Sequence, residues 1–283
     1  MSPSTITNRA ASVRARLLNL SREHDIDFNR ILLLYAQERF LYRLSRSKLK
    51  ANLILKGGIL FYIRDGLSAR PTRDIDFLGL KVPNAPDDFA PYLREILAVE
   101  SDDGLEFDIE NLSVERIVVD AKYEGLRIKL RARLEQAVIP FQIDVGFGDV
   151  IVPRPVKLDF PILLAEERFK IPAYSWESVV AEKLEAIVRF GALTSRMKDF
   201  YDLAFLLRDR KLSKQNLERA IFGTFRNRGT SLEAAVELLS DRSFSKEISW
   251  RAFLRKNRLQ SSESFADVME VISSRLKPIL LNM

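Results

Sequence analysis

The segment that most constrains the fold is residues 53–80, LILKGGILFYIRDGLSARPTRDIDFLGL. Its pattern predicts an apolar strand, a turn at Gly57 and Gly58, a short apolar helix, a polar loop and a second strand that opens with an Asp-Ile-Asp sequence. Because side chains alternate along a strand, Asp74 and Asp76 are expected on one face and the intervening isoleucine on the other. The segment therefore predicts an acidic pair beside a glycine turn.

Two neighbouring carboxylates repel each other unless a cation neutralises them, and a divalent metal does so most readily. The glycine pair allows backbone N–H groups to approach an anion at the start of a helix. Each feature alone favours a structural interpretation, a solvated strand face or an ordinary turn. Together, in this order, they indicate a phosphate site followed by a metal site, which nucleotidyl transfer requires. The arrangement resembles the signature of the DNA polymerase β-like nucleotidyltransferase superfamily, in which GG or GS precedes Asp-x-Asp.

Composition excludes several kinds of chemistry. The 283 residues contain no cysteine and one histidine, His24, so a disulfide framework, a Ser-His-Asp triad and a multi-histidine zinc site are excluded. A reaction in this chain must use carboxylates, lysines and a metal. The formal net charge of +6 is compatible with a polyanionic partner.

No apolar run approaches the roughly 18–20 residues that span a bilayer, and the N-terminal segment lacks the apolar core of a signal peptide. We therefore expect a cytoplasmic protein with no membrane partner.

Flanking segments show helical and strand patterns. Apolar spacing predicts helices from Thr7 to Arg22 and from Asp27 to Ser45, with Asp27 as the N-cap of the second. A further helix is expected from Phe89 to Val99, followed by two or three strands over residues 101–134. The clearest strand alternates apolar residues with basic ones, which are Arg127, Lys129, Arg131 and Arg133. This basic face could line a phosphate-bearing partner or be a solvated sheet face.

A single acid interrupts the apolar strand from Pro140 to Phe147, PFQIDVGF. Burial of an unpaired carboxylate is costly, so Asp144 needs a partner. We expect it to join Asp74 and Asp76 as a third carboxylate that binds the metal and helps to deprotonate the attacking hydroxyl. The alternative is an ion pair with a cation such as Arg127 on a neighbouring strand.

The proline-punctuated stretch from Val150 to Ala173 predicts an extended linker, with a domain boundary near Asp159. We expect a catalytic domain over residues 1–158, including the N-terminal helices, and a helical domain over residues 159–283. The first helix of that domain should begin after an N-cap at Ser175 and end at Gly191.

Lys183 falls on the apolar stripe of this helix, where lysine is normally avoided. It could extend its ammonium to solvent or bind a phosphate. In the next segment, RMKDFYDLAFLLRD, Asp199 and Asp202 lie at or beside the inward face. They could favour the helix dipole, fix Lys183 or help to position a nucleotide, and the pattern does not separate these roles.

Five motifs occur in one order: KGG, RPTRDIDF, IDVGFGD, VAEKLEAI and KDFYDLAFL. Through them the chain resembles the AbiEii family of nucleotidyltransferase-like toxins, which includes the mycobacterial MenT toxins, over residues 52–208. The resemblance implies an α+β fold: a polymerase β-like core, with a mixed sheet and flanking helices, joined to a C-terminal helical domain that closes the nucleotide site. It also implies a toxin–antitoxin system linked to abortive infection, with a cognate antitoxin encoded nearby.

The resemblance further implies roles for particular residues. The triphosphate would contact Gly57 and Gly58, Mg²⁺ (or Mn²⁺) would bind Asp74 and Asp76, and Lys183 would hold phosphate. The remaining implied residues are carboxylates, namely Asp144 as the superfamily's third acid and either Asp199 or Asp202 as the acid of the last motif. Ile59 departs from the family, in which Thr or Ser is frequent after the glycines, so one hydroxyl–phosphate contact is missing.

The expected activity is transfer of a nucleotide from an NTP to RNA, with the 3′ end of tRNA as acceptor, which blocks aminoacylation and translation. The alternatives are transfer to a protein hydroxyl and a nucleotide-binding regulatory module without turnover. A metal-dependent nuclease would leave the glycine pair unexplained.

Overall fold

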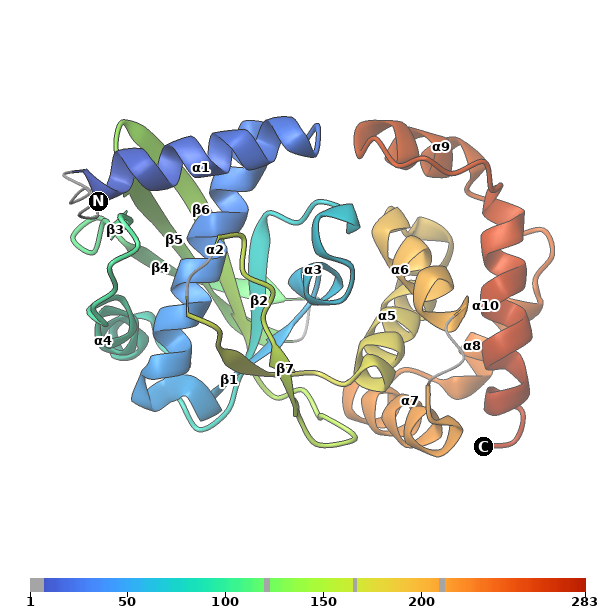
Figure 1. Cartoon of the computed structure of the whole chain (residues 1–283). Helices are drawn as coiled ribbons and strands as arrows, with labels where there is room; N and C mark the ends of the chain where they lie inside the picture. The colour runs from blue at the N-terminus through green and yellow to red at the C-terminus, as the bar shows by residue number, and fades with distance from the viewer. Residues whose placement is uncertain (1–7, 120–122, 165–166, 209–211) are drawn as a thin grey trace. The chain divides into compact units, whose positions relative to one another are not determined.

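The structure is a computed structural model that describes residues 8–119, 123–164, 167–208 and 212–283 (Figure 1). The chain forms two compact units. Unit 1 comprises Met1–Gly148 and Lys157–Ala173, and unit 2 comprises Asp149–Val156 and Tyr174–Met283. This division differs from the expected boundary near residue 159, because the chain returns to unit 1 before it enters the helical unit.

Unit 1 is built on a mixed sheet, to which the described residues contribute eight strands in the order β3-β5-β6-β2-β1-β8-β7, with β4 also beside β5. β1 and β2 are antiparallel, β2 and β6 are parallel, and β5 and β6 are antiparallel. The strands are β1 (Leu53–Lys56), β2 (Asp74–Gly79), β3 (Glu106–Phe107), β4 (Ser113–Val119), β5 (Tyr123–Leu134), β6 (Ala137–Gly146), β7 (Val156–Asp159) and β8 (Lys170–Ala173). The sheet and its helices confirm the predicted fold class.

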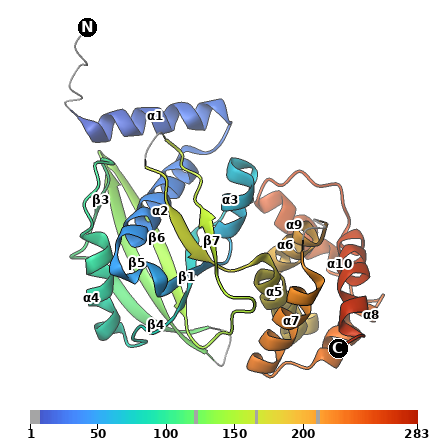
Figure 2. The same cartoon turned by 60° about the horizontal axis from the view of Figure 1, so that its bottom comes forward.

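Helices cover the apolar face of this sheet. They are α1 (Arg9–Glu23), α2 (Phe28–Arg46), α3 (Ile59–Asp65) and α4 (Pro86–Leu97), with short 3-10 turns η1 (Lys48–Ala51) and η2 (Gly66–Ser68). α1 and α2 run across the same side of the sheet in both views (Figures 1 and 2). On α2, the Phe40 ring lies 6.4 Å from that of Phe77 and 6.1 Å from that of Phe141. The opposite face of the sheet carries the acids.

The sequence pattern predicted the first two helices close to their observed bounds. The Asp27 carboxylate accepts a hydrogen bond from the Arg30 N–H and caps α2, as predicted. α1 begins at Arg9 after an Asn8 cap, and Thr7, the expected start, lies outside the described residues.

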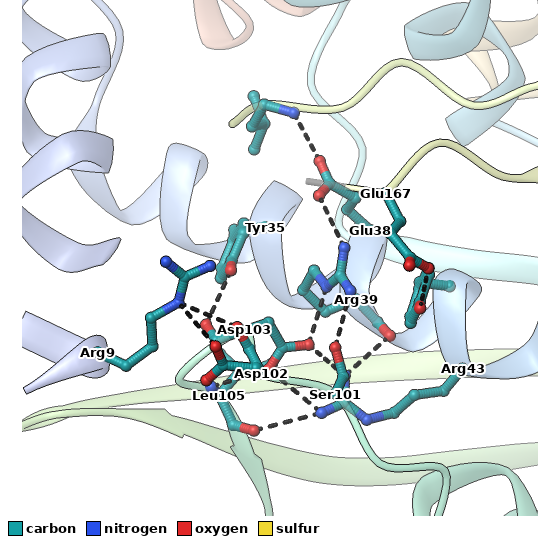
Figure 3. A network of polar contacts seen from close by, with 12 residues as sticks. Arg9, Tyr35, Glu38, Arg39, Arg43, Ser101, Asp102, Asp103, Leu105 and Glu167 are labelled. Atoms are coloured by element: carbon teal, nitrogen blue, oxygen red, sulfur yellow. Dashed lines mark hydrogen bonds and ion pairs between the residues drawn. The ribbon is translucent and has the colours of Figure 1, made fainter. Parts of the chain in front are cut away.

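A buried ion cluster joins α2 to the loop that follows α4 (Figure 3). The Asp103 carboxylate accepts hydrogen bonds from Arg39 Nε at 2.8 Å and Arg43 Nη1 at 2.6 Å. The hydroxyl of Tyr35 donates to the Asp103 carbonyl oxygen at 2.9 Å. Burial opposes ionisation of Asp103, but Arg43 and Arg39 outweigh it and hold the pKa of Asp103 below its usual value. The cluster holds α2 against this loop.

The expected linker over residues 150–173 is in part sheet. Within its described residues, β7 and β8 extend the sheet beyond β1, and Ala173 of β8 pairs with Leu55. α2 also anchors the connection between these strands, since the Leu163 N–H donates to the Glu38 carboxylate at 2.7 Å. Prolines in this segment suggested an unpaired chain, but β7 contains none of them, and β8, which contains Pro172, pairs with β1 at the next residue, Ala173.

Unit 2 is helical in its described residues apart from short connections. Its helices are α5 (Trp176–Phe190), α6 (Met197–Arg208), α7 (Lys214–Arg228), α8 (Leu232–Ser240), α9 (Glu247–Lys256) and α10 (Phe265–Leu280), with a 3-10 turn η3 (Gly191–Leu193) after α5. The Ser175 hydroxyl accepts from the Ser178 N–H at the start of α5, and Gly191 ends it, both as predicted. No described helix is both long and apolar enough to cross a bilayer.

Candidate active site

The glycine turn lies directly against the acidic strand. Gly57 has a φ of +73°, and a Cβ placed there would lie 1.9 Å from Oδ2 of Asp76. Gly58 has an ordinary φ of −66° at the start of α3, but a Cβ there would lie 2.6 Å from Oγ1 of Thr72. The turn therefore requires glycine at position 57 for both its conformation and its space.

Three acids share one face of the sheet. Asp74 and Asp76 are half-buried on one side of β2, and the alternating Ile75 and Phe77 are buried on the other. Asp76 pairs in register with Asp144 on the adjacent parallel strand β6. Paired residues of neighbouring strands point to the same face, so the structure brings together the three carboxylates that the sequence singled out.

The third carboxylate is already held by a cation. Arg127 of β5 donates from Nε to Oδ1 of Asp144 at 3.0 Å and from Nη2 to Oδ2 at 2.8 Å. Gln142 Nε2 adds a hydrogen bond to Oδ1 at 3.0 Å. The ion pair with Arg127 that the sequence left open is present.

Helix α2 fixes the backbone that leads into β2. The buried Gln37 donates from Nε2 to the Arg73 carbonyl oxygen at 3.0 Å, immediately before Asp74. Arg30 donates to the Ala69 carbonyl oxygen at 2.6 Å. The sequence did not lead us to expect a role for either residue. A glutamine within the apolar pattern of α2 could have indicated a buried hydrogen bond.

The donor set fits a hard divalent cation bound by two carboxylates. Magnesium is commonly held by one or two carboxylates, with substrate phosphates and water as its other ligands, and Asp74 and Asp76 supply such a pair. Within the described ranges, no group of three or more acidic or histidine side chains is arranged to hold a metal ion. Asp144 is engaged by Arg127 in this geometry, and its role as a third metal ligand stays a prediction.

Lys183 of α5 lies between two acids of α6. Its ammonium is 2.8 Å from Oδ1 of Asp199 and 2.6 Å from Oδ2 of Asp202, and all three side chains are nearly buried. Arg196 donates to the second oxygen of Asp199 at 2.6 Å. Both acids therefore hold Lys183 in place. This is one of the roles for Asp199 and Asp202 that the sequence left open.

The charges around Asp199 determine its ionisation. Burial opposes its charged form, but Lys183 and Arg196 outweigh burial and hold the pKa of Asp199 well below its usual range. Asp199 is thus an anion at every physiological pH.

A second buried cluster lies at the end of α7. Arg228 contacts Glu185 at 2.8 Å, Asp149 at 3.0 Å and Glu182 at 3.2 Å. Thr230 donates to Glu185 at 2.6 Å. These residues come from distant parts of the sequence, which gave no signal for the cluster.

Among the described residues, basic side chains occur together on β5 and around α9. On β5 part of the charge is neutralised, because Lys129 pairs with Glu115 at 2.9 Å and Arg127 pairs with Asp144. Residues 241–258, around α9, hold six Lys or Arg against two acids. Arg251, Arg255 and Arg258 line an open hollow there.

The fold and the acidic pair beside the glycine turn define a nucleotidyltransferase. A protein from H. pylori described as a candidate nucleotidyltransferase is similar in structure, with a TM-score of 0.51 and 12% identity over 87% of this chain and 92% of that chain. JHP933 from Helicobacter pylori gives a TM-score of 0.51 and 13% identity over 89% and 92%. At these identities the likeness shows the fold alone.

The profile of the nucleotidyl transferase AbiEii toxin family, of a type IV toxin–antitoxin system, matches residues 39–271, and the chain belongs to this family. A search of curated proteins gave no match. The family assignment confirms the resemblance drawn from the five motifs.

Proposed function

We propose that this toxin transfers a nucleoside monophosphate from an NTP to an RNA acceptor, the 3′ end of tRNA, and so blocks translation. The observation that carries the proposal is the Asp74–Asp76 pair, held on one strand face against the backbone of Gly57. It supports the proposal because two carboxylates suited to a divalent metal lie beside a stretch of backbone without side chains, which a bound triphosphate could approach.

In the proposed reaction, the terminal RNA hydroxyl attacks the α-phosphate in line. The bond from the acceptor oxygen to the α-phosphorus forms, the bond from that phosphorus to the bridging oxygen breaks, and pyrophosphate leaves with the bridging electrons. The proton of the attacking hydroxyl passes to water. Asp74 and Asp76 would hold Mg²⁺, which neutralises the phosphate charge when bound. The N–H groups of Gly57 and Gly58 orient the triphosphate.

Lys183 has the role of a phosphate ligand in the proposal. Its ammonium is held by Asp199 and Asp202 in unit 2, so it is fixed in one position and remains charged in a nearly buried setting.

Charge supports RNA as the acceptor over a protein hydroxyl. Residues 241–258 carry a formal charge of +4 from six basic and two acidic residues, against +6 for the entire chain. Arg255 and Arg258 are exposed in this segment and line its hollow. Clustered exposed arginines bind phosphate backbones through charge and bidentate hydrogen bonds.

Membership of the family also implies an antitoxin partner and a nucleotide substrate. We expect the antitoxin to be encoded nearby and to suppress the transfer reaction or the expression of the toxin.

The test incubates the protein with Mg²⁺, total tRNA and each α-labelled NTP in turn. The variant Asp74→Asn/Asp76→Asn should lose labelling, and Asp87→Asn/Asp88→Asn, which removes two exposed acids of α4, should retain it. Label in RNA, with loss of aminoacylation of that RNA, supports the proposal. Label in the protein fraction alone indicates a protein hydroxyl acceptor. Nucleotide binding with no label in any fraction contradicts the transfer reaction.

A further inference from the structure

A row of charges crosses the acid-bearing face of the sheet. The register pairs Lys56 of β1 with Asp76 of β2, Asp76 with Asp144 of β6, and Asp144 with Arg127 of β5. These four side chains therefore share a face, on which a cation at each end flanks two neighbouring anions. A Cβ at Gly146 would lie 4.0 Å from Nζ of Lys56, which shows that this lysine extends over β6 on that face.

Within this row the Asp144 carboxylate has no oxygen without a donor. Arg127 engages both oxygens in a bidentate pair, and Gln142 bonds to Oδ1 as well. A carboxylate that binds a metal or takes a proton needs an oxygen lone pair directed at its ligand. Of its roughly four lone-pair sites, three accept these hydrogen bonds and one, on Oδ2, remains, so the carboxylate is engaged mainly by Arg127.

Arg127 has more N–H donors than its hydrogen bonds to Asp144 use. A guanidinium has five N–H groups, and two of them bond to Asp144. The Arg127 side chain is 36% exposed, against 19% for Asp144, so the guanidinium is anchored by the carboxylate and is still accessible to solvent. The hydrogen bond to Asp144 raises the pKa of Arg127, and Asp74 adds to the rise, which places Arg127 within electrostatic range of the acidic pair.

The acids alone would repel a phosphate, whereas an anchored guanidinium beside them would attract one. The planar fork of arginine binds carboxylate and phosphate with the same bidentate geometry, and an anchored fork loses little conformational freedom on binding. Two carboxylates already suffice for a magnesium ion that also binds phosphates. A third carboxylate is then available to hold the arginine.

We propose that Arg127 binds a phosphate group of a substrate and that Asp144 is its positioning residue, not a third metal ligand. The inference rests on the proposed nucleotidyl transfer, and it specifies how the same face receives phosphate. The phosphate belongs either to the triphosphate of the nucleotide or to the last phosphodiester of the RNA acceptor, which binding measurements separate.

The first experiment measures Mn²⁺ binding to the full chain without substrate, by calorimetry. Asp76→Asn should weaken binding, and Asp144→Asn and Arg127→Met should leave it within about twofold of the wild type. Retained binding also shows that the variants are folded. If Asp144→Asn weakens Mn²⁺ binding as much as Asp76→Asn does, Asp144 is a metal ligand and the proposal is overturned.

The second experiment measures binding of tripolyphosphate and, separately, of a short single-stranded RNA. Arg127→Met should weaken one of them by about tenfold or more, since a charge-assisted bidentate contact is lost. Loss for tripolyphosphate assigns the phosphate to the nucleotide, and loss for RNA alone assigns it to the acceptor. No change for either overturns the proposal.

A double-mutant comparison tests the positioning role. Asp144→Asn should weaken phosphate binding in the wild-type background but not in the Arg127→Met background, because it acts through that arginine. Arg127→Lys should recover only part of the affinity, since an ammonium cannot form the bidentate pair. An equal effect of Asp144→Asn in both backgrounds contradicts the positioning role.

The matched control is the neighbouring cation of the same strand. Lys129→Met removes an ammonium of β5 that contacts Glu115 of β4 at 2.9 Å. This variant should bind tripolyphosphate and RNA as the wild type does. If it loses as much affinity as Arg127→Met, the general charge of the sheet is responsible and the assignment to Arg127 fails. All these measurements are independent of whether tRNA becomes labelled.

Discussion

Replacement of Gly57 by alanine tests whether the glycine turn exists to seat Asp76. An alanine at a φ of +73° costs about 1–2 kcal/mol, because its Cβ crowds the backbone in the left-handed region. The new Cβ would also begin 1.9 Å from Oδ2 of Asp76, whereas real Cβ contacts are essentially never under 3.0 Å. The carboxylate must therefore move by about 1 Å, and a displacement of that size in a reaction centre costs about 100-fold in rate.

The control is Gly229→Ala. Gly229 has a similar φ of +65° after α7, and no heavy atom lies within 4 Å of the added Cβ. Urea denaturation should show a loss of about 1–2 kcal/mol for Gly229→Ala and at least that much for Gly57→Ala. Transfer of labelled nucleotide and Mn²⁺ affinity should fall for Gly57→Ala alone. A normal transfer rate in Gly57→Ala, or an equal loss of activity in both variants, would refute the reasoning.

Three further predictions follow from buried charges and from the basic segment. Asp103→Asn should lower the free energy of unfolding by about 3–5 kcal/mol in urea denaturation, because Arg39 and Arg43 lose a buried partner. The neighbouring Asp102→Asn, whose side chain is 92% exposed, should cost under about 1 kcal/mol, and an equal loss in both would contradict the role of the cluster. Since the pKa of Asp199 is lower in the folded than in the unfolded chain, its stabilisation is full above pH about 4 and declines as the pH falls toward the depressed value. The difference in unfolding free energy between the wild type and Asp199→Asn should therefore shrink below pH 4, and a difference that stays constant to about pH 2 would contradict the lowered pKa. Arg255→Glu/Arg258→Glu should weaken RNA binding and reduce its salt dependence without a change in NTP affinity, whereas wild-type RNA binding in a filter assay would exclude this segment as an RNA surface.

Several features of this protein follow from the sequence because they depend on neighbouring residues. Alternation in Asp-Ile-Asp placed Asp74 and Asp76 on one face, and the double glycine before it marked the turn. Side-chain caps at Asp27 and Ser175 marked helix starts for the same reason, since a cap bonds to a backbone N–H three residues away. The order of five short motifs was enough to indicate the family.

The partners of the charged residues were decided only by the tertiary structure. Alternation fixed the face of Asp144, but the pairing of β6 with both β2 and β5 determined that it lies between Asp76 and Arg127. Asp103 meets Arg39 across 64 residues of sequence, and residues 157–173 rejoin the sheet beyond β1. Strand order and register arise from packing between distant segments, so a local pattern can give the face of a side chain but not the residue that lies opposite it.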